Sequence, residues 1–351
     1  MKDNHAIYKI FGMRPLSVGI SPLAGDDGIS NRFSASDAGV LAYTADLPDG
    51  SVRSFIGKKK SFRIVTNGIL MLCEGDVLLL VLLLMNHKIL GYNGSAMRES
   101  RLYSAFDESL KPHLPNIYGT ASRPLFGDCF IAMEEFPHIQ PSNSDIYRVI
   151  DAILPFHAQY YRDESFSRIH GVNIYSKSVH RSSRRGLKRM FRRLAKENIS
   201  LFGEKKTVAI EAFIDNLHNE SAAVSFHRTV THNDLSYRNI SCSDGVVIYD
   251  WELACYQNPE HDIIELLISL LHELSADEVR SALSYHRQRL SELTGVSLTD
   301  KQYAVILRFN TLEFCINKLS MLRIAARRIP LPYIEQFTRN TSAMMDILDI
   351  T

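Results

Sequence analysis

The chain has 351 residues, of which 45% are hydrophobic and 23% are charged, and this composition is typical of ordinary globular proteins. Lysine and arginine together number 40 against 39 aspartate and glutamate residues, so no excess of charge favours nucleic acid or an anionic membrane as a partner. The five cysteines lie apart without a CxxC pair, which predicts reduced thiols in a cytoplasmic protein and argues against disulfides or a zinc site.

Residues 20–65 have the pattern of strands and turns. The opening segment of the chain, MKDNHAIYKIFG, lacks the apolar core that a signal peptide needs, so we expect no secretory leader. Between residues 20 and 65, β-type residues stand on both sides of a Pro-Asp-Gly turn at Pro48–Gly50. This arrangement predicts a β-hairpin.

A leucine-rich run, VLLLVLLLM at Val77–Met85, lies inside a segment of helical pattern at 66–106. A helix needs ~18 consecutive apolar residues to span a bilayer, and this run reaches about half that length. Glu74 and Asp76 stand just before it. We therefore expect a helix that is buried or packed on a sheet, and no membrane span.

The pattern changes near residue 137. The segment DCFIAMEEF at 128–136 predicts a buried strand, and the polar, proline-bearing segment at 137–145 is the best candidate for a hinge. Helical patterns then predominate, near 145–161, 178–197, 205–219, 259–273, 276–293, 301–327 and 331–348. We thus expect an α+β fold of two lobes, an antiparallel sheet lobe at 1–136 and a mostly helical lobe at 137–351.

The segment THNDLSYRNISCSDGVVIYDWE at 231–252 concentrates polar groups around two short strand-like pieces. Asp234 and Asn239 share one predicted loop, and Asp250 ends the next predicted strand. Pairing of the strands as a hairpin would bring the three side chains to one end. Because carboxylate and amide oxygens are ligands that suit magnesium, the segment predicts a magnesium site.

Phosphoryl transfer to an alcohol requires a loop over the phosphates, a lysine on them, metal ligands, and a carboxylate that orients the acceptor. The sequence offers a candidate for each in a sensible order. Gly28 and Ser30 belong to a glycine-bearing turn, AGDDGISN, whose backbone could approach phosphate. Lys58 ends a predicted strand, and Glu99 in the next predicted helix could hold its ammonium group.

These segments together resemble the aminoglycoside phosphotransferase and choline kinase superfamily, the protein-kinase-like enzymes that phosphorylate small molecules. The resemblance runs over nearly the whole chain, and its most specific segments are THNDLSYRN and IYDWELACYQNPEHDIIELL. It implies a protein-kinase-like arrangement of the two lobes. It also implies ATP or GTP as co-substrate, Mg2+ as cofactor, and a hydroxyl group of a small molecule as acceptor.

The resemblance implies a role for each matching residue. Asp234 becomes the catalytic acid–base, and Asn239 and Asp250 become magnesium ligands. Lys58 becomes the lysine on the phosphates, with Glu99 as its partner. The remaining positions are Gly28 and Ser30 at the phosphates, Glu134 in the linker 133–137 whose backbone meets the adenine, His232 as a brace of the loop, Glu252 near the metal or the substrate, and Asp262 behind the loop.

Three features leave alternatives open. Arg238, inside the motif, either adds charge near the phosphates or faces solvent. The insertion at 63–92 either covers the sheet lobe or forms a partner surface. The basic segment at 177–196 is either a solvated helix face or a site for an anionic acceptor or an acidic partner.

The alternative to an active kinase is a catalytically silent, kinase-like protein that binds nucleotide or regulates another protein. Such a protein would be expected to lack one of the groups that the chemistry requires. Lys58, Asp234, Asn239 and Asp250 are all present, which favours the active enzyme.

Overall fold

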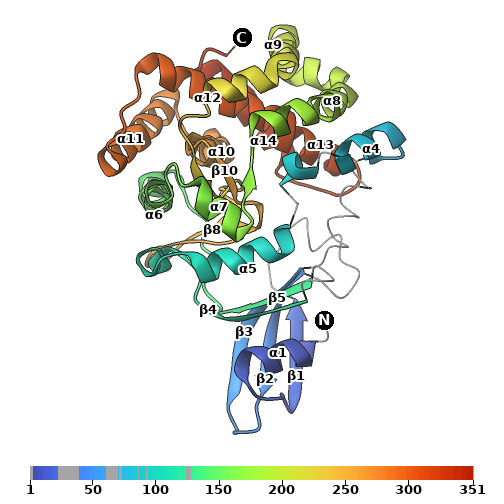
Figure 1. The fold of residues 1–351 in the computed structure, drawn as a ribbon, viewed down its shortest axis with the longest axis vertical. Helices are drawn as coiled ribbons and strands as arrows, with labels where there is room; N and C mark the ends of the chain where they lie inside the picture. Colours follow the sequence, from blue (N-terminus) through green and yellow to red (C-terminus); the bar gives the residue numbers. More distant parts are fainter. Residues whose placement is uncertain are drawn as a thin grey trace.

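The structure, a computed structural model, describes residues 3–22, 39–60, 70, 73–85, 87–91, 94–123 and 128–350. Gly28 and Ser30, the residues predicted at the phosphates, lie outside these ranges. The described chain forms a sheet part and a larger helical part, and the C-terminus lies among the helices (Figure 1). The predicted α+β fold of two lobes is therefore confirmed.

Five antiparallel strands form the sheet, in the spatial order β1-β2-β3-β5-β4. The bounds are β1 Ser17–Pro22, β2 Gly39–Asp46, β3 Val52–Lys60, β4 Ile117–Arg123 and β5 Asp128–Met133. The turn between β2 and β3 falls at the predicted Pro48–Gly50, where the Gly50 amide donates to the carbonyl of Leu47 at 3.0 Å. The predicted hairpin is confirmed.

Side chains of β3 alternate between two apolar cores, as the two-residue period of a strand requires. Phe55 packs into a small core with helix α1 (Asp3–Phe11). Ile56 belongs to the large core that continues into the helical part. Helix α5 (Ser95–Ala105) lies between that second face of the sheet and the helices beyond it (Figure 1).

Residues 134–142, all of them described, form no helix or strand and lead to the 3₁₀ turn η4 (Asn143–Asp145). Asp145 stands at the N-cap position of the next helix, but its carboxylate makes no capping bond there and accepts from the backbone and hydroxyl of Ser142. The predicted lobe boundary at 136/137 falls inside this segment and stays a prediction.

The helical part contains each helix that the sequence predicts beyond the hinge. The bounds are α6 Ile146–Gln159, α7 Glu164–His170, α8 Lys177–Arg193, α9 Ala195–Ala223, α10 Glu260–Leu270, α11 Ala276–Thr294, α12 Asp300–Phe314, α13 Ser320–Ala326 and α14 Ile334–Ile347. A single turn of π-helix, Cys315–Leu319, here called the π-turn, joins α12 to α13. Such turns are rare in proteins, and those that exist often lie at functional sites.

Two small sheets lie within the helical part. Strand β10 (Cys255–Gln257) pairs with β6 (Asn173–Ile174) on one side and with β7 (Thr229–Thr231) on the other. Strands β8 (Ile240–Cys242) and β9 (Val246–Ile248) form an antiparallel hairpin. The hairpin is the one that the sequence predicts between Asn239 and Asp250.

Helix α4 (Val77–Met85) contains the leucine-rich run and packs against α8 in the helical part, although it precedes β4 in the chain. Leu79 and Leu83 are buried, whereas Val77 and Met85 are 71% and 74% exposed. The expectation of a buried helix thus holds for one face only. None of the helices in the described ranges is both long and apolar enough to cross a bilayer.

The basic segment at 177–196 is partly neutralised by acids of the same chain. Arg189 pairs with Asp76 at 2.6 Å, and Arg193 pairs with Glu74, so two cations of α8 hold the residues that precede α4. Pairs to α9 are Lys188–Asp215 and Arg192–Glu211. This face of α8 is therefore in part an internal junction rather than only a solvated surface.

Candidate active site

Three consecutive lysines at the end of β3 point alternately to the two faces of the sheet. Lys58 and Lys60 reach acids of the helical part. Lys59 bonds to Asp3 of α1 at 3.0 Å. The period of the strand therefore places two of the three ammonium groups at the junction between the sheet and the helical part.

Gly57, directly before these lysines, has no room for a side chain. A Cβ atom there would lie 2.4 Å from Cε2 of Tyr43 and 2.7 Å from Cζ of Phe130. The two rings thus pack against bare backbone on the face away from Lys58. This close approach sets the position of the strand that carries the lysines.

Lys58 is the centre of the first charged cluster. Its Nζ donates to Oε1 of Glu99 at 2.8 Å and to Oδ1 of Asp250 at 2.6 Å. The hydroxyl of Tyr103, one turn after Glu99 on α5, donates to Oε1 of Glu99 at 3.0 Å and accepts the amide of Asp250 at 3.3 Å. The structure thus brings the predicted lysine and glutamate together and adds Asp250 as a third member.

The ionisation of this cluster follows from its pairing. Burial alone would lower the pKa of Lys58, but the charges of Asp250 and Glu99 hold that pKa above its ordinary value. Burial raises the pKa of Glu99. Burial would also raise the pKa of Asp250, yet the ammonium of Lys58 brings it below the usual range. Lys58 is therefore a cation and Asp250 an anion at neutral pH.

Glu252 extends the cluster from the 3₁₀ turn η6 (Trp251–Leu253). Its Oε2 lies 2.5 Å from Nζ of Lys60. One carboxylate oxygen each from Glu99, Asp250 and Glu252 lie within 4.8 Å of one another. Carboxylate oxygens are hard ligands of the kind that magnesium prefers.

Asn239 and Asp250 stand at the same end of the β8–β9 hairpin, one directly before β8 and the other two residues after β9. The amide Nδ2 of Asn239 donates to the carbonyl of Asp234 at 2.8 Å. Asp250 has φ 68° and ψ 51°, a left-handed conformation that is strained for residues other than glycine and that clusters at functional sites. That Asn239 shares a cation with Asp250 stays a prediction.

The loop that carries Asp234 is held by Asp262, at the start of α10. One oxygen of Asp262 accepts the amide of His232 at 2.8 Å, and the other accepts the amide of Asn233 at 2.8 Å. His157 of α6 donates to the same carboxylate at 3.0 Å. Asp262 therefore holds the backbone of the loop from the start of α10.

His232 lies inside the loop. Its Nε2 donates to the carbonyl of Tyr249 at 2.8 Å, and its Nδ1 accepts the amide of Asp234 at 3.2 Å. Burial lowers the pKa of His232, and the neutral ring that results matches this pattern of one donor and one acceptor. The ring also packs against Trp251, with centroids 4.8 Å apart. His232 thus links the residues before Asp234 to those before Asp250.

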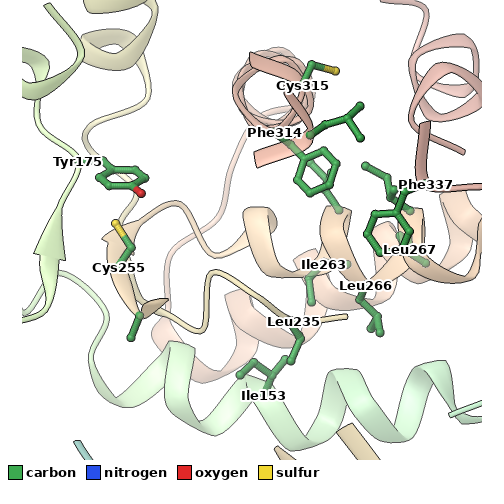
Figure 2. Close-up of a cluster of buried hydrophobic side chains, with 14 of the residues drawn as sticks. Ile153, Tyr175, Leu235, Cys255, Ile263, Leu266, Leu267, Phe314, Cys315 and Phe337 are labelled. Atoms are coloured by element: carbon green, nitrogen blue, oxygen red, sulfur yellow. The ribbon is translucent and has the colours of Figure 1, made fainter. Parts of the chain in front are cut away.

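Leu235 anchors the loop to the apolar core. Its side chain is fully buried beside Ile153 of α6, with Ile263 and Leu266 of α10 near it (Figure 2). Burying an aliphatic side chain of this size contributes about 1.5–3 kcal/mol to stability. The residue next to Asp234 is therefore fixed by packing as well as by hydrogen bonds.

Asp234 is paired with Lys318 of the π-turn. Nζ of Lys318 lies 2.5 Å from Oδ1 of Asp234 and also donates to the carboxylate of Glu265 on α10. Burial alone would raise the pKa of Asp234, but the charges of Lys318 and Arg238, together with the hydrogen bond from Lys318, hold this pKa below the usual range. Asp234 is therefore ionised at neutral pH.

Arg238 and Glu134 are two further predicted residues, in the 3₁₀ turn at Tyr237–Asn239 and directly after β5. The guanidinium carbon of Arg238 lies 4.1 Å above the centre of the Tyr333 ring, so the side chain is partly buried and does not simply face solvent. The side chain of Glu134 is exposed, and its amide donates to the carbonyl of Asn116 at 2.9 Å.

Sequence reasoning missed Lys60, Lys318 and Glu265. Lys60 carried a usable signal, because it stands two residues after Lys58 on a strand and must face the same side. Lys318 is 84 residues from Asp234 and carried no such signal.

The chain was compared with protein families and with curated proteins. A model of the phosphotransferase enzyme family (APH) matches residues 80–293, more than half of the chain. A search of curated proteins finds no match.

Solved structures align with the chain over most of its length. The choline kinase LicA from Streptococcus pneumoniae shares 13% identity and a TM-score of 0.49, over 98% of this chain and 96% of its own. The macrolide 2'-phosphotransferase MphH from Brachybacterium faecium shares 13% identity and a TM-score of 0.49, over 97% and 95%. The amicoumacin kinase hAmiN, solved with AMP-PNP and Ca2+, shares 12% identity and a TM-score of 0.45, over 89% and 88%.

The family match includes Glu99, Asp234 and Asp250, so it spans the loop and the acids that the structure brings to the junction. Lys58 and Lys318 lie outside the matched range and reach these acids through the fold. The chain belongs to the phosphotransferase enzyme family.

Proposed function

We propose that the protein transfers the γ-phosphoryl group of ATP or GTP to a hydroxyl group of a small molecule. The observation that supports this most is the convergence of Lys58, Glu99 and Asp250 beside the loop of Asp234. A cation on the phosphates, metal ligands and a carboxylate at the acceptor are the parts that the reaction requires.

Lys58 would bind the nucleotide phosphates, with Glu99 holding its side chain in place. The phosphate oxygens would compete with Asp250 for the ammonium group, which would free that carboxylate for the metal. Asn239, Asp250 and Glu252 would hold a magnesium ion, which would neutralise part of the phosphate charge when bound. The remaining nucleotide contacts would come from the main chain of 133–137, including Glu134, and from Gly28 and Ser30.

Asp234 would act on the acceptor. An alcohol is barely acidic, so its proton must leave as the new bond to phosphorus forms. A carboxylate within hydrogen-bond reach orients the hydroxyl and accepts the proton late in the step. The ionised state of Asp234 beside Lys318 supports this role.

The charge around Asp234 is mixed. Lys318 and Arg238 are cations, and Glu265 is a second acid. This balance singles out neither a polycationic nor a polyanionic acceptor. The proposed acceptor is therefore a small alcohol of either charge, and the experiment includes both kinds.

The test is acceptor-dependent consumption of MgATP and MgGTP with a panel of amino alcohols, amino sugars, macrolides and anionic alcohols. We expect at least one acceptor to yield a phosphorylated product of the correct mass. Nucleotide binding without transfer to any acceptor or to water would favour the catalytically silent alternative. Absence of nucleotide binding by calorimetry would overturn both.

A further inference from the structure

Lys318 contacts the loop of Asp234 through three acceptors. Its Nζ lies 2.5 Å from Oδ1 of Asp234 and 3.3 Å from the carbonyl of Asn233, and it donates to the carboxylate of Glu265. An ammonium group has three protons, so these acceptors use its full capacity. Lys318 is therefore engaged with the protein rather than available to a substrate.

These contacts restrain Asp234 in two ways. The bond to Oδ1 holds the side chain, and the bond to the Asn233 carbonyl holds the backbone directly before it. The Asn233 amide is held by Asp262 from the other side. The second carboxylate oxygen of Asp234, Oδ2, is then the one available to the acceptor hydroxyl.

Glu265 gives Lys318 a second counter-charge. Its side chain is fully buried on α10, and both acids share the one ammonium group. When Asp234 takes the proton of the acceptor it becomes neutral. Without Glu265, Lys318 would then be a buried cation with no anionic partner, which is unfavourable. With Glu265 present, the ammonium stays paired before and after the proton moves.

The π-turn Cys315–Leu319 places Lys318. A wider turn changes the direction of the side chains that follow it, and such turns persist frequently at functional sites. The turn is held by Asn317, whose Nδ2 donates to Oε1 of Glu313 at 3.1 Å and to the carbonyl of Ile89 at 2.8 Å. The unusual backbone thus coincides with the residue that bonds to Asp234.

We propose that Lys318 and Glu265 form a positioning pair for Asp234. Lys318, together with Arg238, keeps the carboxylate ionised against burial and the nearby charge of Asp250. Lys318 also holds the carboxylate in one orientation, and Glu265 keeps Lys318 paired while the proton moves. In the step, the acceptor O–H gives its proton to Oδ2 of Asp234. Its oxygen bonds to the γ-phosphorus as the bond from phosphorus to the β,γ-bridging oxygen breaks, and the nucleoside diphosphate leaves with that electron pair. The inference rests on the proposed function.

The test compares the pH dependence of turnover in Lys318→Met, Glu265→Gln and the wild type, with the best acceptor from the panel or with water. Removal of the Lys318 charge destabilises ionised Asp234, so the acidic limb of kcat should move to higher pH by about one unit or more. Glu265→Gln removes a competing anion, so the limb should move to lower pH. The KM for nucleotide should stay within about twofold in both.

Lys206→Met is the matched control. Lys206 is also a mostly buried lysine, but it bonds to the carbonyl of Ser342 at 2.9 Å and to Asp346 at 2.7 Å, away from the loop. Its pH profile should match the wild type. Where Lys318→Met does not fold, Lys318→Arg, which should retain the acidic limb, and Glu265→Gln carry the comparison.

An NMR titration of protein labelled with [13Cγ]-aspartate measures the pKa of Asp234 directly in the wild type and both variants, without turnover. The Asp234 signal is assigned by its absence in Asp234→Asn. Opposite shifts in Lys318→Met and Glu265→Gln support the positioning pair, even if no acceptor is turned over. An active wild type whose profile and titration superimpose on those of both variants overturns the pair and leaves the proposed function intact. A wild type that transfers phosphate to nothing overturns the proposed function instead.

Discussion

Two buried charge clusters differ in how the fold assembles them. The junction cluster consists of Lys58, Lys60, Glu99, Asp250 and Glu252 and joins the sheet part to the helical part. The loop cluster consists of Asp234, Lys318 and Glu265 and lies wholly within the helical part. The first therefore depends on how the two parts sit relative to each other, and the second does not.

This difference suggests a division of tasks. Groups at a junction between two parts can adjust to a nucleotide and a metal ion that enter between them. An acid–base has to be held within a fraction of an ångström of its reacting position, which favours rigid elements of one part. The comparison predicts that changes in the two clusters will affect different kinetic constants.

Asp234→Asn should have the largest effect on turnover. The substitution keeps the shape and removes the charge, so kcat should fall by ~10²-fold or more, the usual scale for loss of a general base. Nucleotide affinity by calorimetry should change little, because Lys58 and the acids at the junction remain. Wild-type turnover in this variant would show that the carboxylate does not take the proton.

Lys58→Met should affect binding as well as turnover. A charge-assisted hydrogen bond contributes about 1.5–3 kcal/mol, so the nucleotide Kd should rise at least ~10-fold. Lys59→Met is the matched control, since the adjacent side chain faces α1 and bonds to Asp3. Equally weak nucleotide binding by both variants would show that the alternation of side chains along β3 does not distinguish Lys58 from Lys59.

His286→Gln should change the acid sensitivity of the structure behind the loop. His286 lies 3.3 Å from His157, which bonds to Asp262, and burial, together with the proximity of that second imidazole, lowers the pKa of His286 to about 3. In the unfolded chain the pKa is about 6.5, so between these values the unfolded state binds more protons. Stability therefore falls as pH drops below 6.5, by about 1.4 kcal/mol per unit from this residue.

The free energy of unfolding of wild type and variant, measured with urea at pH 6.5 and 5.0, checks this expectation. His286→Gln should lose about 2 kcal/mol less than the wild type across that interval. His272→Gln, at a side chain that is 43% exposed, should show the same loss as the wild type. Equal losses in all three proteins would mean that His286 is not kept neutral by burial.

Glu74→Gln should have the smallest effect, because it keeps the shape of the side chain and weakens partly buried ion pairs that lie away from both clusters. Glu74 pairs with Arg193 and lies 3.5 Å from Arg327, and partly exposed pairs of this kind contribute at most about 1 kcal/mol. Thermal stability should fall slightly, and kcat and nucleotide Kd should stay unchanged. A marked loss of turnover would instead connect the α4–α8 junction to the active site.

Several parts of the fold could be predicted from local patterns. The Pro48–Gly50 hairpin, the change to helices beyond residue 137, and the hairpin between Asn239 and Asp250 all depend on residues close together in the chain. Lys58 and Glu99 were predicted as partners from a resemblance, and their pairing depends on the packing of α5 on the sheet.

Other features could not be predicted because they depend on contacts between distant segments. The leucine-rich run predicted a buried helix. How much of a helix is buried depends on the elements that pack against it, and α8 covers only one side of α4. The position of Arg238 in the sequence was compatible with solvent or with phosphate, and the contact with the Tyr333 ring, 95 residues away, decides how its side chain lies. Likewise, Arg189 and Arg193 of the basic segment form ion pairs with Asp76 and Glu74, more than 100 residues earlier in the chain.

By itself, the sequence determined the element types and offered candidates for the residues that carry the chemistry, because strand alternation, helical periodicity and turn residues act over a few positions. Only the tertiary structure decided which charges meet. Lys318 reaches Asp234 across 84 residues, and Lys60 reaches Glu252 across 192. An ion pair depends on the distance between two groups in space, and no local spacing in the chain encodes that distance.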